Sequence, residues 1–140
     1  SYIAADLACD TVASIGAGTV KRTPQDHERA TYAPMLSKEL SPIDWTMTAS
    51  EVHNKIRGLS PWPSANANLC GKTVKIHKSI LANEKGSKAG EIVVCDKRLV
   101  VCCGDNNCIE ILNIQAEGKK AMSAADFLRG NALEKGSYFE

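Results

Sequence analysis

Histidine, cysteine and lysine are the residues of this sequence that could do chemistry. The three histidines, His27, His53 and His77, lie in three separate segments, and none has a serine, cysteine or aspartate at a spacing that indicates a nucleophile and its base. No Gly-x-Gly-x-x-Gly or Walker loop is present to bind a nucleotide phosphate. We therefore predict no catalytic residue and no cofactor-binding residue in this chain.

The cysteines resemble small core residues more than metal ligands or disulfide partners. Zinc sites usually take paired cysteines with two to four residues between them, and adjacent strand residues point to opposite faces. The cluster formed by Cys95, Cys102, Cys103 and Cys108 does not follow that spacing, so we predict no metal site. Cys9 and Cys70 are separated by 60 residues without a cysteine. This disfavours a secreted disulfide framework and favours reduced thiols in a cytoplasmic protein.

Basic residues gather in the second part of the 140-residue chain. Residues 1–52 carry 4 Lys or Arg against 7 Asp or Glu, whereas residues 53–140 carry 13 against 9. This excess indicates a polyanionic partner, although lysines can also simply solvate exposed strand faces and edges. Phosphate contacts need cations spread over a surface without fixed spacing. The lysines that meet this requirement are Lys72, Lys75, Lys78, Lys85, Lys88, Lys119 and Lys120.

Aromatic residues and long apolar runs are scarce. Two Phe, two Trp and three Tyr are present, and none alternates through the predicted strands. The sequence therefore favours recognition of the backbone or shape of a structured duplex over stacking of single bases. No run approaches the roughly 18 apolar residues of a membrane-spanning helix, so we expect no membrane partner.

The elements predicted to carry these lysines follow a helix and a long extended segment. An apolar stripe over residues 2–15 predicts an amphipathic helix that ends at Gly16 to Gly18. Three prolines and the lack of a sustained period predict an extended linker over residues 19–46. Because the helix begins so close to the first residue, which is not methionine, we expect the chain to come from a longer protein.

Residues 47–63 predict a capped helix and a rigid exit. Thr48 and Glu51 form a capping box, with Met47 placed to pack on Val52. Gly58 and Ser60-Pro61 supply the stop. We expect Trp62, held between two prolines, to pack against the core.

After Asn66 the pattern becomes that of strands. Leu69 to His77 predicts a hairpin with Gly71-Lys72 as its two-residue turn, Val74 and Ile76 on one face and Lys75 and His77 on the other. Residues 91–103 predict a second hairpin around Asp96-Lys97, and residues 108–114 predict a further strand.

A short helix capped by Ser123, with Asp126 and Gly130 as its other signals, ends the chain. About five strands with hairpin connections predict a mainly β fold with flanking helices, a small open antiparallel barrel that resembles an oligonucleotide-binding fold. An open sheet packed by helices is the competing architecture.

Several motifs in this order resemble the C-terminal part of the methionyl-tRNA formyltransferase family, over nearly the whole chain. The motifs are Thr31-Tyr32-Ala33-Pro34, Leu36-Ser37-Lys38-Glu39, Ile43-Asp44-Trp45, Pro61-Trp62-Pro63, Gly118-Lys119-Lys120-Ala121-Met122 and Phe127-Leu128-Arg129-Gly130. The resemblance implies that residues 1–18 are the last helix of a truncated catalytic domain, residues 19–46 a linker and residues 47–140 a C-terminal barrel domain. Met35 departs from the pattern, since many family members have a basic residue there.

The resemblance also implies a function. The family transfers a formyl group from 10-formyltetrahydrofolate to the methionine amino group on initiator tRNA, with a catalytic motif that this chain lacks. The chain alone is therefore expected to be inactive and to bind no cofactor. Its expected partners are the phosphate backbone of initiator methionyl-tRNA, with Lys38 as a further contact, and the N-terminal catalytic domain; we expect a monomer. The alternative is the C-terminal domain of a nucleotide-sugar formyltransferase or of formyltetrahydrofolate dehydrogenase.

Overall fold

The computed structural model describes residues 2–140, which form two units that are considered separately, one ending at Pro34 and one comprising Met35–Glu140. The first unit contains the predicted helix, α1 (Tyr2–Gly16), whose apolar stripe is exposed. Gly18 ends the helix in a left-handed conformation, at a φ of 69°. A single 3-10 turn, η1 (His27–Arg29), interrupts the extended segment that follows.

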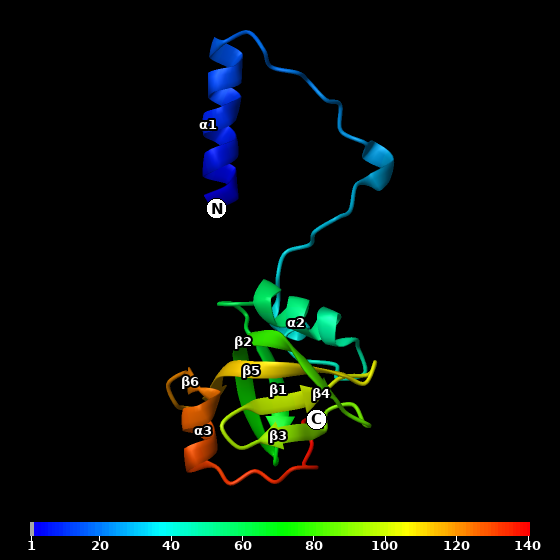
Figure 1. Cartoon of the computed structure of the whole chain (residues 1–140), viewed down its shortest axis with the longest axis vertical. Coiled ribbons are helices and arrows are strands. Elements are labelled where there is room, and N and C mark those ends of the chain that lie inside the picture. Colours follow the sequence, from blue (N-terminus) through cyan, green and yellow to red (C-terminus); the bar gives the residue numbers. More distant parts are fainter. Residues whose placement is uncertain (1) are drawn as a thin grey trace. The chain divides into compact units, whose positions relative to one another are not determined.

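The second unit is a strongly curved antiparallel sheet with two helices packed on it (Figure 1). After the 3-10 turn η2 (Lys38–Leu40), the chain forms α2 (Ala49–Gly58), the strands, and α3 (Ala124–Gly130). The strands are β1 (Ala65–Leu69), β2 (Lys72–Lys85), β3 (Ile92–Cys95), β4 (Leu99–Cys102), β5 (Asn107–Ala116) and β6 (Met122–Ser123). The sheet order is β1-β2-β5-β4-β3, with β6 paired to β5. The prediction of a mainly β fold with flanking helices, built as a small open antiparallel barrel, is confirmed, with six strands where about five were expected.

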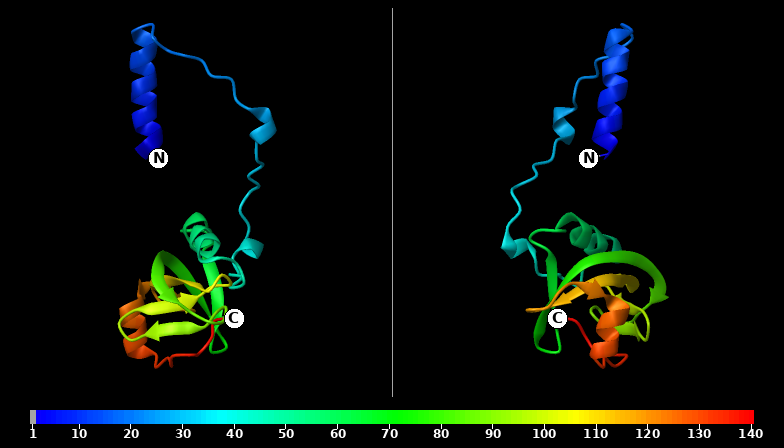
Figure 2. Two further views of the ribbon diagram at one scale, coloured as in Figure 1. Left: turned by 45° about the vertical axis from the view of Figure 1, so that its right-hand side comes forward. Right: turned by 90° about the vertical axis from the view of Figure 1, so that its left-hand side faces the viewer.

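Both helices of this unit begin as their sequences predict. At α2 the hydroxyl of Thr48 accepts a hydrogen bond from the amide of Glu51, whose carboxylate accepts one from the amide of Thr48 at 2.9 Å. At α3 the amide of Asp126 donates to the hydroxyl of Ser123 at 3.1 Å. Val52 and Ile56 of α2 and Phe127 of α3 are buried in the core. The two helices lie apart along the curved sheet and pack into one core (Figure 2).

The first hairpin differs from its prediction by one residue. Leu69 pairs with Lys72, so the two-residue turn is Cys70-Gly71 rather than Gly71-Lys72. Cys70 and Gly71 both have positive φ, 51° and 74°, which is the conformation of a type I′ turn. The predicted alternation after the turn is confirmed, because Val74 and Ile76 are buried while Lys75 is exposed.

The expected packing of Trp62 is wrong. Its side chain is 55% exposed, whereas Trp45, from the segment predicted to be a linker, is 5% exposed and lies in the core. Pro63 and Ser64, which follow Trp62, are buried and direct the chain into β1. The two prolines thus fix the path of the backbone while the indole between them remains in solvent.

The last residues of the chain lie between the two edge strands. Asn68 of β1 exchanges two backbone hydrogen bonds of 2.8 Å with Glu140, and the amide of Phe139 donates to the carbonyl of Gly90, just before β3, at 2.9 Å. Phe139 packs on Trp45, with ring centroids 5.3 Å apart. Gly90 has a φ of 80°, and a Cβ there would lie 2.4 Å from the Phe139 carbonyl oxygen. We call residues 137–140 the C-terminal seam.

Candidate nucleic-acid interface

The predicted lysine ligands lie on three kinds of element and are all exposed. Lys72, Lys75 and Lys78 belong to β2, whose inward positions are taken by Val74 and Ile76. Lys119 and Lys120 lie in the loop between β5 and β6, Lys38 lies in η2, and Lys88 lies in the loop between β2 and β3.

Three of these lysines meet around two surface hollows. One hollow, of about 300 Å³, is lined by Lys75 and Gln115, and the other, of about 680 Å³, is lined by Lys72 and Lys119. Both hollows are lined by Ala116 and Glu117, so they adjoin at the end of β5. The structure therefore brings together Lys72, Lys75 and Lys119, which are 47 residues apart in the sequence at their extremes. We call this group the lysine end of β2.

The other predicted ligands lie elsewhere. Lys78 follows a β-bulge and stands opposite Asn113. The ammonium of Lys88 lies 4.5 Å from the centre of the Tyr138 ring, in a cation–π contact at the C-terminal seam. Lys85 donates a hydrogen bond to Asn107. Lys72, Lys75 and Lys119 thus line adjoining hollows, and the other predicted ligands lie outside them.

The ion pairs of residues 2–140 leave every predicted lysine ligand unpaired. Arg98 pairs with Glu84 and Glu110, and Arg129 pairs with Asp126. Two carboxylates line the hollows: Glu117 lines both and forms no ion pair within residues 2–140, and Asp126 lines the larger one and is the partner of Arg129. The ammonium groups at the lysine end are therefore available to anions.

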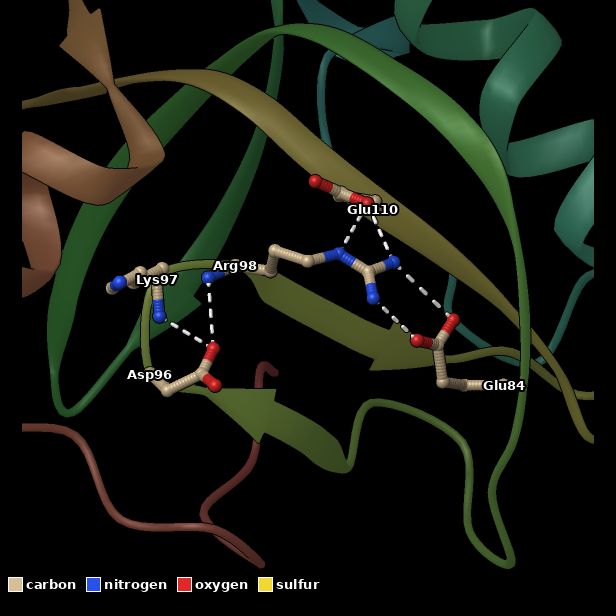
Figure 3. A network of polar contacts seen from close by, with 5 residues as sticks. All are labelled: Glu84, Asp96, Lys97, Arg98 and Glu110. Carbon is tan, nitrogen blue, oxygen red and sulfur yellow. Dashed lines mark hydrogen bonds and ion pairs between the residues drawn. The ribbon is translucent and has the colours of Figure 1, made fainter.

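At the far end of β2 the charges are used within the protein (Figure 3). Nη1 of Arg98 lies 2.6 Å from a carboxylate oxygen of Glu84 on β2, and Nη2 lies 2.7 Å from Glu110 on β5. The hydrogen bond from Arg98 lowers the pKa of Glu84. In turn, the hydrogen bonds to Glu110 and Glu84 raise the pKa of the Arg98 guanidinium above its ordinary value. The backbone amides of Arg98 and Lys97 lower the pKa of Asp96. We call Glu84, Arg98 and Glu110 the paired end of β2.

This network was not predicted from the sequence. Arg98 belongs to the basic excess of residues 53–140, whereas the structure neutralises its guanidinium with two carboxylates that are 14 and 12 residues away in the sequence. Glu110 falls in a predicted strand, but Glu84 lies beyond the strand predicted to end at His77, so the sequence pattern did not pair them.

The histidines are engaged in contacts that do not form a catalytic arrangement. Nδ1 of His53 lies 3.0 Å from the hydroxyl of Ser79, which is buried between α2 and β2. Nε2 of His77 lies 2.9 Å from Oε1 of Gln115. His27 is exposed in η1. A buried serine has no path to a substrate, so the His53–Ser79 contact is explained by packing.

Burial lowers the reactivity of three of the clustered thiols, those of Cys102, Cys103 and Cys108. Cys102 and Cys108, opposite each other on β4 and β5, are fully buried in a small second core with Val100, and Cys103 is buried in the main core. Burial raises the pKa of Cys102, and it raises the pKa values of Cys103 and Cys108 to about 12. Across residues 2–140, no three or more His, Cys, Asp or Glu side chains are grouped so that they could hold a metal ion.

Among the helices of residues 2–140, none combines the length and the apolar character needed to cross a membrane. The helices that the structure describes instead serve as a cover for the sheet or, in the first unit, as a separate element.

Comparison with protein families gives a match over residues 35–132 to the formyl transferase C-terminal domain. The methionyl-tRNA formyltransferase of Acidobacterium capsulatum is 42% identical over 130 residues, which cover 92% of this chain and 42% of that protein. The enzyme of the same name from Streptococcus pyogenes serotype M28 is 38% identical over 140 residues, 99% of this chain and 45% of that protein. The chain thus spans less than half the length of these relatives.

Solved structures with the same fold include HypX from Aquifex aeolicus. Its complex with tetrahydrofolic acid is 20% identical, with a TM-score of 0.57 over 92% of this chain and 25% of that chain. A multiply substituted variant of the same protein gives a TM-score of 0.58 at 19% identity, over 92% of this chain and 24% of that chain. At this level of identity the likeness concerns the fold alone.

Proposed function

Because the chain belongs to the formyl transferase C-terminal domain family, we propose that it is the tRNA-binding C-terminal part of a methionyl-tRNA formyltransferase. In this proposal the whole protein is cytoplasmic and transfers a formyl group from 10-formyltetrahydrofolate to the amino group of methionine on initiator tRNA. The donor and the catalytic centre belong to the part of the protein that this chain does not span. Residues 1–18 then end the catalytic domain, residues 19–46 link it, and residues 47–140 bind tRNA as part of a monomer.

The main support for tRNA binding is the lysine end of β2. Its three ammonium groups are exposed, unpaired and gathered around adjoining hollows at one end of the sheet. Such a surface suits the phosphates of an RNA helix, because phosphate contacts need cations at the right distance but no fixed base geometry. Thr73 adds a neutral hydrogen-bonding group to the same surface.

Lys78, Lys120 and Lys38 extend this surface in the proposal. Lys120 follows Lys119 in the loop, and Lys78 continues β2 past the bulge. Lys38 is exposed on η2 and is assigned a contact from the linker side. Lys88 is the weakest of the seven assignments, since its ammonium already lies over the Tyr138 ring.

The test is a titration of labelled initiator and elongator tRNA with this chain at two salt concentrations. We expect both tRNAs to bind, with log K falling by roughly 0.7 to 0.9 per phosphate contact for each unit of log salt. Lys72→Glu, Lys75→Glu and Lys119→Glu combined should weaken binding of both by at least about tenfold at low salt. Lys21→Glu, Lys97→Glu and Lys135→Glu combined, at three exposed lysines outside the proposed surface, change the net charge by the same amount and are the matched control.

Two results would overturn the proposal. The first is binding that does not change between the two salt concentrations, which would exclude a phosphate-based mechanism. The second is a triple variant that binds as the control does, which would place any RNA surface elsewhere. The alternative of a nucleotide-sugar formyltransferase or a formyltetrahydrofolate dehydrogenase would be favoured if the full-length parent, normally expressed, failed to complement a formylase-deficient bacterium.

A further inference from the structure

The loop that carries Lys119 and Lys120 is held to the sheet by the side chain of one residue, Gln115. The amide of Lys119 donates to the carbonyl of Ala116 at 3.1 Å, which forms the turn. The carbonyl of Lys119 accepts a hydrogen bond of 2.7 Å from Nε2 of Gln115. The peptide groups on both sides of the Lys119 Cα are therefore hydrogen-bonded. The Lys119 carbonyl receives its hydrogen bond from the Gln115 side chain on β5.

The other end of the Gln115 amide is also occupied. Nε2 of His77 on β2 lies 2.9 Å from Oε1 of Gln115. Because the nitrogen of the amide donates to Lys119, its oxygen faces His77 and accepts from the imidazole N–H. A continuous hydrogen-bonded chain thus joins β2, β5 and the loop, and it fixes the orientation of the glutamine side chain.

This chain of contacts lies beside the lysine end of β2. Gln115 lines the smaller hollow together with Lys75, and Lys119 lines the larger one together with Lys72. His77 is two residues after Lys75 on the same strand. The position of the Lys119 Cα relative to Lys72 and Lys75 is thereby set by the Gln115 amide.

We propose that Gln115 is a positioning residue that, with His77, holds the 117–121 loop ready for RNA phosphates. The inference rests on the proposed function. It assigns to an uncharged residue a part in RNA binding that the proposed function gives only to lysines. Lysine side chains and loop backbones lose conformational freedom when they bind, and a loop that is already held in place loses less of it. A net hydrogen bond of this kind corresponds to a factor of roughly 2 to 10 in an equilibrium constant.

A positioning role can be separated from a direct phosphate contact by salt dependence. Removing a lysine that meets a phosphate removes a released counterion, so the slope of log K against log salt should change by about 0.7 to 0.9. Removing the tether leaves the same lysines able to meet the same phosphates, at a greater ordering cost. The affinity should then fall by a similar factor at each salt concentration while the slope stays unchanged.

The experiment compares Gln115→Met, which keeps the length of the side chain but not its hydrogen bonds, with Asn113→Leu, a loss of an amide on the same strand. Neither substitution changes the net charge. Limited trypsin digestion of the free chain measures the loop directly, because trypsin cleaves after Lys119 and Lys120. Binding of a labelled tRNA over a salt series measures the consequence, with Lys119→Gln as the charge-removing comparison.

We expect Gln115→Met to be cleaved in the loop roughly 2 to 10 times faster than the unsubstituted chain, and to bind tRNA more weakly by a similar factor with an unchanged salt slope. His77→Ala should have a smaller effect in the same direction and add little to Gln115→Met, since both remove one chain of contacts. Asn113→Leu should change neither measurement.

The outcomes separate this inference from the proposed function. Unchanged loop cleavage in Gln115→Met overturns the tether, whatever the RNA result. Faster cleavage with unchanged tRNA affinity overturns the positioning role and leaves tRNA binding in place. An unsubstituted chain that binds no tRNA overturns the proposed function and the positioning role together, and the cleavage rates then report only how the loop is held.

Discussion

At its first end, β2 carries lysines that no carboxylate of residues 2–140 neutralises, whereas at its far end Glu84 shares the guanidinium of Arg98 with Glu110. The lysine end is bordered by surface hollows, and the paired end lies beside a small second core. One strand therefore presents free charge at one end and uses charge to fasten three strands at the other. A basic side chain therefore indicates a surface for anions only where no carboxylate of the protein neutralises it.

The largest expected contrast between the two ends concerns their thiols. Cys70 lies exposed in the turn next to the lysine end, whereas Cys108 lies buried beside the paired end. Burial raises the pKa of Cys108 from 9.0 to about 12, which lowers its thiolate fraction at pH 8 by roughly 1,000-fold relative to an ordinary thiol. Iodoacetamide labelling followed by mass spectrometry should therefore modify Cys70 quickly and Cys108 only slowly.

In denaturant the six cysteines should react at similar rates, which controls for the labelling chemistry. Equal rates for Cys70 and Cys108 in the folded chain would show that the second core opens readily, and the contrast between the two ends of β2 would then be lost.

A second test converts the paired end into a free one. Glu84→Gln combined with Glu110→Gln should release Arg98 and, on the proposed function, raise the affinity for tRNA by roughly threefold at low salt, with a salt slope steeper by up to about 0.9. Glu28→Gln combined with Glu134→Gln, which removes two exposed carboxylates outside the network, is the control for net charge. An unchanged slope in the double variant would mean that pairing is not what keeps Arg98 from binding RNA.

The smallest expected effect is on stability and depends on pH. The hydrogen bond from Arg98 lowers the pKa of Glu84 below its ordinary value of 4.5. The pair therefore stabilises the fold fully above about pH 4.5, and this contribution is lost as the pH falls through the lower pKa of the folded state. Urea unfolding should show Arg98→Gln to be less stable than the unsubstituted chain at pH 7, with the difference shrinking toward pH 3. A difference that is the same at both pH values would assign the loss to packing of the arginine stem.

Local signals predicted much of this fold because they act over a few residues. The Thr48 and Glu51 box, the alternation around Lys75 and the cap at Ser123 each depend on neighbours within four positions, and the structure contains all three. The exact turn of the first hairpin escaped prediction because Cys70 adopts a positive φ, which is uncommon for a residue with a side chain.

Features that depend on distant partners could not be predicted. The bulge in β2 changes the phase of the strand, so Ser79 is buried while Ile80 and Leu81 are exposed, and the sequence alternation does not continue through it. The buried tryptophan, Trp45, packs on Phe139, a residue 94 positions later in the sequence that no local pattern connects with it.

For the candidate site, the sequence predicted the lysines but not their grouping. Lys72 and Lys119 come together only because β2 and β5 pair along most of their length, and the role of Gln115 arises from contacts 38 residues apart and across a loop. A polar residue on a strand carries no mark in the sequence that distinguishes a tether from a solvated side chain.

The C-terminal seam has a consequence for how the chain is synthesised. Residues 137–140 follow every strand in chain order, so all six strands leave the ribosome before the segment that hydrogen-bonds to Asn68 and Gly90 becomes available. Until then the outer edges of β1 and β3 expose unpaired backbone groups of the kind that recruit other chains. Once the six strands have paired, these two edges are the part of the sheet that the C-terminal seam still has to cover, and synthesis of Phe139 and Glu140 supplies the backbone groups that do so.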